Sequence, residues 1–540
     1  MKRNGMCPLC FVKQLLMPPK KVSDIYDDTP YGGCPTPPMG WSSWNTFRNN
    51  IDHDLIVETG RIMKERGLLD AGYRYLNLDD NWHSSMRTAE GLLQGDLTRF
   101  PAGIASLVQE LNALGLKVGI YSSNGTLTCE DLPATLGNET LDALTFARWG
   151  IEFFKHDFCH NVPIPRYAPL VYGVEVAQCG TGAGTFYPCT DAALTGLARR
   201  MPDKRVKTGC HVSGLDACRG AMEYSNIYAE EGGDYVLTVC CRKKGQYDKA
   251  ILIEVNGKDG DVIPIPSQKH WNYTSRFQTV VRLEKGVNRV RLFNPVASRA
   301  DSAMLQYRKM SRALRAATAQ VAAERGEAEK PIVFSICEWG KNQPYRWGRS
   351  TGNLWRTTPD IRPIFPWIKW IYNHTVEKYA YAGVGGYNDP DMLEVGNGKL
   401  TEDQNKSHFA LWCMMAAPLI LGNDLRKMDD KILEIVTNRD LIAIDQDALC
   451  KPAKRIRKGG LDILARPLEG GRTAVCFFNK THYTVSASIA LNELAADRYV
   501  ALPQKAEYRV RAVYAGGSSV VKDVVGVTLP RDATEVFILE

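Results

Sequence analysis

Several short apolar runs along the chain end in polar or charged residues. The clearest four are 75–78, 116–120, 151–154 and 332–336. Helix-like stretches lie between them at 100–114 and 141–149, and strands that alternate with helices indicate parallel βαβ units. Polar residues gathered at the carboxyl ends of many strands favour an α/β fold of the (β/α)8 barrel type, since such barrels carry their active site on that face.

The spacing of the strand ends predicts a large insertion in this barrel. The strand-end markers are Trp44, Asp79, Tyr121, Asp157, Glu338, Asp360 and Asn388. Successive markers lie 35, 42, 36, 181, 22 and 28 residues apart, whereas a barrel of roughly 250 residues averages about 30 per βα unit. Strand-like runs at 234–239, 251–257, 277–281 and 287–293, with a hairpin-turn signal at Asn256-Gly257, fill the long gap. An inserted β-sandwich is therefore predicted, and the Ala/Arg-rich stretch 308–324 is interpreted as the delayed barrel helix.

A third pattern follows residue 447. Short alternating strands are expected at 461–466, 473–479, 485–489, 508–513 and 535–539. They predict a C-terminal antiparallel β-sandwich. The predicted domains are an N-terminal arm at 1–33, a barrel made of 34–168 and 311–452, the inserted sandwich at 169–310 and the C-terminal domain at 453–540.

Composition narrows the class of protein. Hydrophobic residues make up 44% and charged residues 24% of the chain, the balance of an ordinary globular protein. The net charge of +7 comes without a long basic block, so no nucleic-acid partner is predicted. The chain has no run of 18 apolar residues, so no membrane helix is predicted. The apolar stretch 412–421 is interrupted by Pro418 and is interpreted as buried core.

The cysteines and the N-terminus bear on the cellular location of the protein. Lys13 interrupts the only early apolar stretch, so the first residues make a poor signal peptide. The 15 cysteines form no short-spaced framework, and the lone pair Cys7 and Cys10 is interpreted as part of a solvated arm rather than a zinc or redox site. A cytoplasmic location is predicted, with secretion left open.

Carboxylates carry the candidate chemistry. Acidic residues at the strand ends are Asp79, Asp80, Asp157, Glu338, Asp360, Asp389 and Asp391. Lys155, Arg356 and several tryptophans lie among them, and this mixture of carboxylates, cations and aromatic walls suits a sugar. No metal-ligand spacing or phosphate-binding loop accompanies them, so no metal or cofactor is predicted. Glycoside hydrolysis by two carboxylates is the leading reaction class.

The motifs themselves resemble a known family. The segment 36–45 is similar to the opening motif of glycoside hydrolase family 27, which contains α-galactosidases and α-N-acetylgalactosaminidases. Matching motifs follow in order at 78–82, 119–121, 155–159, 337–340, 355–360 and 388–393. The resemblance covers about residues 34–160 and 330–540. It implies a (β/α)8 barrel followed by an antiparallel β-domain.

The resemblance also implies roles. Asp157 would be the nucleophile and Asp360 the general acid and base, with their carboxyl groups about 5–5.5 Å apart. Lys155 would lower the pKa of Asp157, whereas Asp360 would need a raised pKa. The implied sugar contacts are Asp79 and Asp80 to O4 and O6, Lys155 to O3 and O4, Glu338 and Arg356 to O2, and Trp44, Tyr121, Trp339, Asp391 and Met392 as the pocket wall. Cys129 and Cys159 match a pair that is bridged in many relatives.

Several alternatives stay open at this stage. The bulk of Glu338 and Trp339 favours galactose over N-acetylgalactosamine, and the intact Asp79-Asp80 pair places β-L-arabinopyranosidase activity second. A non-catalytic galactoside-binding or assembly protein is the rival class. The insertion resembles carbohydrate-binding modules, and Trp271 and Tyr273 could stack on glycan or pack in its core. The expected partner is a galactose-containing oligosaccharide or glycoconjugate, and a homo-oligomer is left open.

Three further predictions concern His156, Asp389 and the cysteines of the insertion. His156 is expected to pack or to hydrogen-bond locally rather than to catalyse. Asp389 could fix its loop or touch sugar. The six cysteines of the insertion could be bridges or buried thiols, and they are Cys179, Cys189, Cys210, Cys218, Cys240 and Cys241.

Overall fold

The computed structural model describes residues 30–180, 184–243, 247–266 and 273–540. The described chain divides into two compact units, of which one holds the residues up to Asn161 together with Met310–Glu540 and the other holds Val162–Lys309. The predicted insertion, 169–310, overlaps the second unit. Cys7, Cys10, Trp271 and most of the predicted N-terminal arm lie outside the described residues, as does the side chain of Tyr273.

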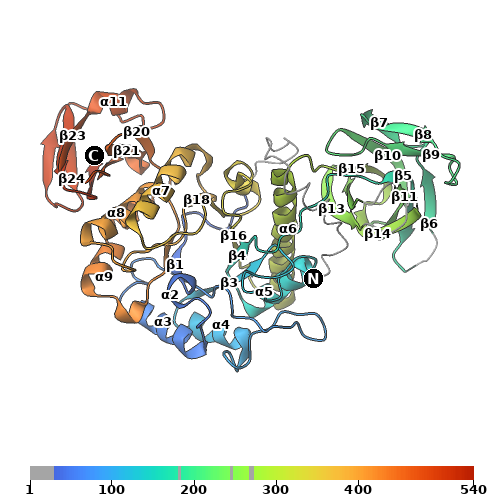
Figure 1. Ribbon diagram of the computed structural model, residues 1–540, viewed down its shortest axis with the longest axis horizontal. Coiled ribbons are helices and arrows are strands. Elements are labelled where there is room, and N and C mark those ends of the chain that lie inside the picture. Colours follow the sequence, from blue (N-terminus) through green and yellow to red (C-terminus); the bar gives the residue numbers. More distant parts are fainter. Residues whose placement is uncertain (1–29, 181–183, 244–246, 267–272) are drawn as a thin grey trace. The chain divides into compact units, whose positions relative to one another are not determined.

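The first unit contains a parallel sheet with eight strands in its described residues. The strands are β1 (Met39–Ser42), β2 (Tyr75–Asn77), β3 (Lys117–Ser123), β4 (Phe153–Asp157), β16 (Val333–Ile336), β17 (Leu354–Arg356), β18 (Tyr387–Asp389) and β19 (Leu419–Leu421). Their order is β18-β17-β16-β4-β3-β2-β1-β19. A parallel bridge between Leu393 and Leu421 joins the segment after β18 to β19. The sheet curls on itself (Figure 1), which confirms the predicted barrel.

Helices follow the strands. They are α2 (Trp44–Phe47), α3 (His53–Glu65), α4 (Gly103–Ala113), α5 (Glu139–Trp149), α6 (Arg299–Arg325), α7 (Phe365–Thr375), α8 (Glu402–Met414), α9 (Asp430–Val436) and α10 (Arg439–Asp445). The predicted helices at 100–114 and 141–149 are α4 and α5. α6 begins nine residues before the predicted 308, because Ser298 and Asp301 cap it: the backbone N of Asp301 donates to Ser298 Oγ at 3.2 Å, and the N of Ser298 donates to Asp301 Oδ2 at 2.8 Å.

The second unit is built from antiparallel strands. They are β5 (Leu170–Gln178), β6 (Gly184–Pro188), β7 (Ala193–Gly196), β8 (Arg199–Pro202), β9 (Cys210–Ser213), β10 (Gly220–Ala229), β11 (Gly233–Lys243), β12 (Lys249–Val255), β13 (Lys258–Ile265), β14 (Tyr273–Leu283) and β15 (Gly286–Phe293). One sheet has the order β13-β12-β15-β10-β7 and the other β14-β11-β5-β9-β8, with β6 beside β5. Side chains of both sheets share one buried core, so the unit is a β-sandwich.

Two details of this sandwich bear on the sequence predictions. Asn256 and Gly257 have φ angles of 51° and 77° and turn the chain between β12 and β13, as the hairpin signal predicted. Cys189 and Cys210 are thiols whose sulfur atoms lie 3.4 Å apart.

The C-terminal part of the first unit is a second antiparallel domain. Its elements are β20 (Lys454–Arg457), β21 (Leu461–Pro467), β22 (Thr473–Asn479), β23 (Val485–Ala490), α11 (Leu491–Ala496), β24 (Tyr508–Ala512), β25 (Ser518–Val521), β26 (Val524–Leu529) and β27 (Thr534–Leu539). One sheet has the order β20-β21-β22-β27-β24-β25, and β23 pairs with β26. The predicted C-terminal sandwich is confirmed. Among the described helices, none is long and apolar enough to cross a membrane.

Candidate active site

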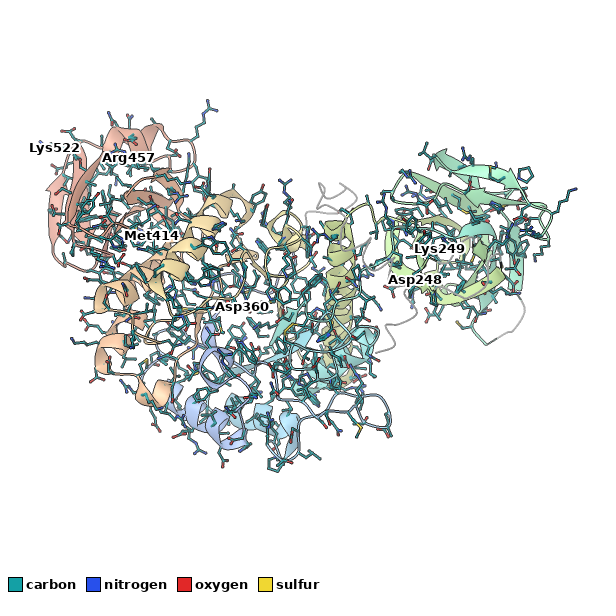
Figure 2. The ribbon with its side chains drawn as sticks, in the orientation of Figure 1. Asp248, Lys249, Asp360, Met414, Arg457 and Lys522 are labelled. Atoms are coloured by element: carbon teal, nitrogen blue, oxygen red, sulfur yellow. A yellow bond between two sulfur atoms is a disulfide. The ribbon has the colours of Figure 1, made fainter. Side chains whose placement is uncertain are left out.

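A cavity opens where the carboxyl ends of the barrel strands meet. Its polar lining includes Ser42, Asp79, Lys155, Arg356, Asp389 and Asp391, with Met392 at the wall. Side chains alternate between the two faces of a strand, so residues two apart along β4 or β17 share the inner face. Figure 2 places Asp360 in the middle of the barrel unit, in the loop between β17 and α7.

Asp157 ends β4 and is only 6% exposed. Its Oδ1 accepts the backbone N–H of Phe158 at 2.8 Å, and its Oδ2 accepts the hydroxyl of Tyr121 at 3.2 Å. Burial raises the pKa of Asp157 to about 6, because desolvation outweighs the lowering effect of Lys155. Lys155 therefore lowers the pKa of Asp157, as predicted, but burial leaves the net pKa above its ordinary value.

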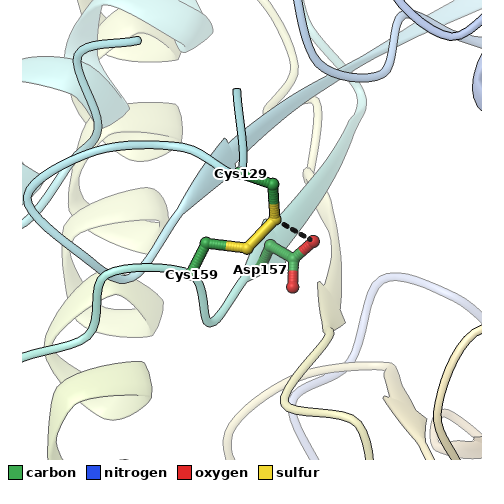
Figure 3. A group of neighbouring side chains, drawn as sticks. All are labelled: Cys129, Asp157 and Cys159. Carbon is green, nitrogen blue, oxygen red and sulfur yellow. Dashed lines mark hydrogen bonds between the residues drawn. A yellow bond between two sulfur atoms is a disulfide. The ribbon is translucent and has the colours of Figure 1, made fainter. Parts of the chain in front are cut away.

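A disulfide joins Cys129 to Cys159, two residues beyond Asp157. Figure 3 shows the bridge against the carboxylate, with Sγ of Cys129 3.7 Å from Oδ2 of Asp157. Within the described residues, Cys129, Asp157 and Cys159 bring their ligand atoms within 4.8 Å of one another, close enough for a metal. The disulfide leaves neither sulfur a thiolate, however, so these residues do not suit a metal ion.

Asp79 and Lys155 form an ion pair inside the cavity. The Nζ of Lys155 lies 2.8 Å from Oδ2 of Asp79, and Ser42 Oγ lies 3.5 Å from the same oxygen. Burial lowers the pKa of Lys155, but Asp79 and other nearby anions raise it more, and the net pKa lies well above its ordinary value. The lysine is thus charged and fixed toward the cavity.

Asp80 has different surroundings from Asp79. Its carboxylate accepts the backbone N–H groups of Asn81 at 2.8 Å and Glu130 at 3.1 Å. Burial raises its pKa to about 6. These hydrogen bonds tie the segment after β2 to the loop that holds Glu130, while Asp79 lines the cavity.

Arg356 links two carboxylates. Its Nη2 lies 2.7 Å from Asp391 Oδ2 and 3.1 Å from Asp360 Oδ1. The Arg356 side chain is 3% exposed, whereas that of Asp360 is 68% exposed. Asp391 has a φ of 84°, in the left-handed region, and its Oδ2 also accepts the N–H of Ile361 at 2.8 Å.

The charges around Asp360 overturn one prediction. Partial desolvation raises the pKa of Asp360, but Arg356 and Lys155 lower it more, and the net pKa lies below the ordinary value. The predicted rise is therefore wrong for this structure, because the nearby cations stabilise the carboxylate. Asp360 in turn raises the pKa of Asp157, so the two carboxyl groups are electrostatically coupled.

Glu338 lies two residues after the end of β16. It is fully buried, its Oε2 accepts the N–H of Asn342 at 2.6 Å, and it does not line the cavity. Burial raises its pKa to about 8. Asp157 and Asp360 are absent from the same lining, so the predicted contact of Glu338 with O2 stays a prediction. Ser335 on β16 lines the cavity, and Sγ of Cys337, one residue after β16 ends, lies 3.6 Å from Arg356 Nη1.

The remaining predicted residues fall into two groups. Tyr121 and Met392 are buried beside the cavity carboxylates, and half-buried Trp44 begins α2. Trp339 has a φ of 59°, meets Phe158 edge-on at 6.3 Å and carries Lys341 4.2 Å over its ring. Sequence reasoning missed Ser42 and Cys337, although both lie at the carboxyl end of a barrel strand.

Two local predictions can also be compared with the structure. Nε2 of His156 lies 2.8 Å from Thr135 Oγ1, and burial lowers the pKa of His156 to about 3, which confirms a local hydrogen-bonding role. Asp389 lines the cavity and its Oδ1 accepts the N–H of Asp391 at 2.8 Å, so it at least fixes the loop that holds Asp391.

Two coupled carboxyl groups at the open end of a (β/α)8 barrel, with cations beside them, are typical of a glycoside hydrolase. The family model described as "Alpha galactosidase A" matches residues 36–214 and 276–447. The model described as "Alpha galactosidase C-terminal beta sandwich domain" matches residues 458–539. The chain belongs to the α-galactosidase family, glycoside hydrolase family 27.

Individual relatives agree with this placement. The chain is 29% identical over 511 residues to "Alpha-galactosidase A" of Cellvibrio japonicus, covering 92% of this chain and 89% of the relative. It is 30% identical over 447 residues to "Alpha-galactosidase 2" of Arabidopsis thaliana, covering 82% and 76%. The fold is similar to that of α-galactosidase I from Mortierella vinacea, with a TM-score of 0.64 at 23% identity over 94% of this chain and 98% of the other.

Proposed function

We propose that the protein is an exo-acting α-galactosidase that removes terminal α-linked galactose with retention of configuration. The observation that carries the proposal is the coupled pair Asp157 and Asp360 beside a cavity that also holds the Asp79–Lys155 ion pair. The substrate is a galactose-containing oligosaccharide or glycoconjugate.

The reaction has two displacements. In the first, the carboxylate of Asp157 attacks C1 of galactose while the bond from C1 to the leaving oxygen breaks and Asp360 gives that oxygen a proton. In the second, Asp360 takes a proton from water, whose oxygen attacks C1 and releases Asp157. The first step forms an ester and the second hydrolyses it, so galactose leaves with its original anomeric configuration.

The pKa values of the unliganded enzyme set the starting point for this cycle. Asp157, with a pKa of about 6, is ionised above that pH, as a nucleophile must be. Asp360 is exposed and paired with Arg356, so it must take up its proton from solvent when the substrate binds. A bound galactoside would cover Asp360 and draw sugar hydroxyls to Arg356, and both effects raise the pKa of Asp360.

Sugar selection is proposed to rest on the opposite wall of the cavity. The charged pair Asp79–Lys155 offers one acceptor and one donor side by side, which suits the adjacent hydroxyls of galactose with its axial O4. The steric case against an N-acetyl group at C2 rests on the bulk of Glu338 and Trp339. A family 27 structure titled as a β-L-arabinopyranosidase has the same fold, with a TM-score of 0.58 at 15% identity, so the fold does not separate these activities.

The test is a panel of three nitrophenyl glycosides: an α-galactoside, an α-N-acetylgalactosaminide and a β-L-arabinopyranoside. The α-galactoside should be hydrolysed fastest, and NMR should detect α-galactose as the first product. Faster turnover of either other glycoside would reassign the substrate. Binding of galactose without any hydrolysis would favour the non-catalytic class.

Three further points remain proposals. The inserted sandwich would dock glycan. Deleting residues 169–294, which leaves α6 intact, tests this if activity falls on polymers and not on small galactosides. A homo-oligomer and a cytoplasmic location also stay predictions, to be checked by light scattering and by cell fractionation.

A further inference from the structure

The helix that follows Asp360 carries aromatic side chains on its outer side. Along α7, Phe365, Ile368, Ile371, Tyr372 and Thr375 are buried. The opposite stripe consists of Trp367, Trp370 and His374, spaced three and four residues apart, with both tryptophans partly exposed and His374 exposed. Large aromatic rings left at the surface in one row commonly mark a binding site.

The three rings form one ordered stack. The rings of Trp367 and Trp370 lie 4.7 Å apart with an angle of 6° between their planes, and His374 lies 3.9 Å from Trp370. Nδ1 of His374 donates to the carbonyl oxygen of Trp370 at 2.8 Å, which holds the last ring in place. Trp370 contacts both other rings, so Trp367 is one end of the row. In the described part of the chain, no ring other than Trp370 and no cation stacks on Trp367.

The free end of the stack is next to the catalytic acid. Nε1 of Trp367 donates to the backbone carbonyl oxygen of Asp360 at 2.9 Å. In the proposed reaction Asp360 protonates the oxygen of the leaving group. The leaving group must therefore lie beside Asp360, within reach of the indole that is bonded to the same residue.

The other side of α7 holds the helix firmly. Lys369 pairs with Asp532 at 3.0 Å, and the hydroxyl of Tyr372 donates to Asp462 at 2.9 Å. Both partners belong to the C-terminal sandwich, and Figure 1 shows α7 beside that domain. The aromatic row is thus mounted on a fixed helix, which lowers the entropic cost of stacking a ligand on it.

We infer that Trp367, backed by Trp370 and His374, is a stacking platform for the sugar residues of the leaving group. This inference rests on the proposed function and assigns its substrate class: α-galactosides whose galactose is attached to further sugar. The C–H face of a pyranose ring is apolar and packs on an indole face, while its hydroxyls stay in water.

The test compares two α-galactosides that need the same protonation by Asp360. Methyl α-galactoside has a leaving group too small to stack, whereas raffinose releases sucrose. Released galactose gives kcat/KM for each substrate in wild type, Trp367→Leu and Trp367→Phe. The ratio of raffinose to methyl α-galactoside should fall roughly tenfold in Trp367→Leu, mainly through KM, as expected for the loss of one stacked ring.

The Trp367→Phe variant separates stacking from the hydrogen bond. It removes the indole N–H but keeps a ring, so its ratio should fall only about two- to threefold, since most of the stacking area remains. Tyr483→Ala, which removes a ring that is 68% exposed on the C-terminal sandwich, is the matched control and should leave the ratio unchanged.

Each remaining outcome is decisive. Equal losses on both substrates would show that Trp367 only positions Asp360, and the platform would be wrong. An unchanged ratio in Trp367→Leu would overturn it as well. If the wild type failed to hydrolyse methyl α-galactoside, the proposed function would fail first, and the platform would fall with it.

Discussion

Replacing Glu338 by glutamine tests the raised pKa of this buried carboxyl group. In the folded protein its pKa is about 8 instead of the ordinary 4.5. The group therefore keeps its proton in the folded state at pH values where the unfolded chain has lost it. Stability from this group is fully present below pH 4.5 and is lost as the pH rises toward 8.

The size of the effect follows from the two pKa values. At about 1.4 kcal/mol per pH unit, the change from 4.5 to about 8 corresponds to about 5 kcal/mol of unfolding free energy. Glutamine resembles the protonated form, since its carbonyl oxygen can accept the N–H of Asn342 and its amide can donate. Glu338→Gln should thus match wild type near pH 4.5 and exceed it by roughly 5 kcal/mol at pH 8.5.

Urea unfolding at pH 4.5, 6.5 and 8.5 measures this difference. Glu327→Gln, at an exposed glutamate, is the matched control and should show no such trend. Equal stabilities of Glu338→Gln and wild type at pH 8.5 would refute the raised pKa. A loss of α-galactosidase activity beyond about tenfold in the variant, the cost of one transition-state hydrogen bond, would show that Glu338 does touch the sugar.

Three further predictions concern the site. Asp360→Asn should lower kcat on methyl α-galactoside by about 10²- to 10⁴-fold, because the general acid and base is lost. The control Asp523→Asn, at an exposed position, should leave kcat unchanged, and a retained kcat in Asp360→Asn would remove Asp360 from the mechanism. In the unliganded enzyme kcat/KM should fall on the acid side with an apparent pKa near 6, because protonation silences Asp157, and a limb near 4 would contradict the raised value. Replacing Cys129 and Cys159 by serine removes a bridge across 30 residues and should lower the unfolding free energy by about 3–4 kcal/mol in a urea titration, whereas an unchanged midpoint would mean that the bridge does not form.

Much of the fold was accessible from the pattern of the chain. The runs ending at Asp79, Tyr121 and Asp157 are barrel strands, because parallel strands buried on both faces leave continuous apolar stretches that end where the site begins. β19 could not be recognised as a strand from the sequence. The apolar run 412–421 contains both the end of α8 and β19, and no polar residue separates them. The start of α6 was missed because its capping pair lies at Ser298, before the Ala/Arg-rich stretch.

The sequence predicted which residues form the site better than it predicted their pKa values. Asp79, Lys155, Arg356 and Asp391 do line one cavity, as strand-end positions require. The pKa of Asp360 depends on Arg356 and Lys155 approaching it in space, and the pKa of Asp157 on how deeply β4 is buried. Neither quantity is visible in a motif. The pKa of Asp360 came out opposite to the prediction, and at Asp157 burial outweighs the predicted lowering by Lys155.

The most direct test of the proposed mechanism is azide rescue of the Asp157→Gly variant. Removing the carboxylate should abolish turnover of a nitrophenyl α-galactoside, and azide should then enter from the face that Asp157 occupied. Restored release of nitrophenol with β-galactosyl azide as the product, identified by NMR, is the predicted result. Normal turnover without azide, or an α-galactosyl azide, would contradict the assignment of Asp157 as the nucleophile.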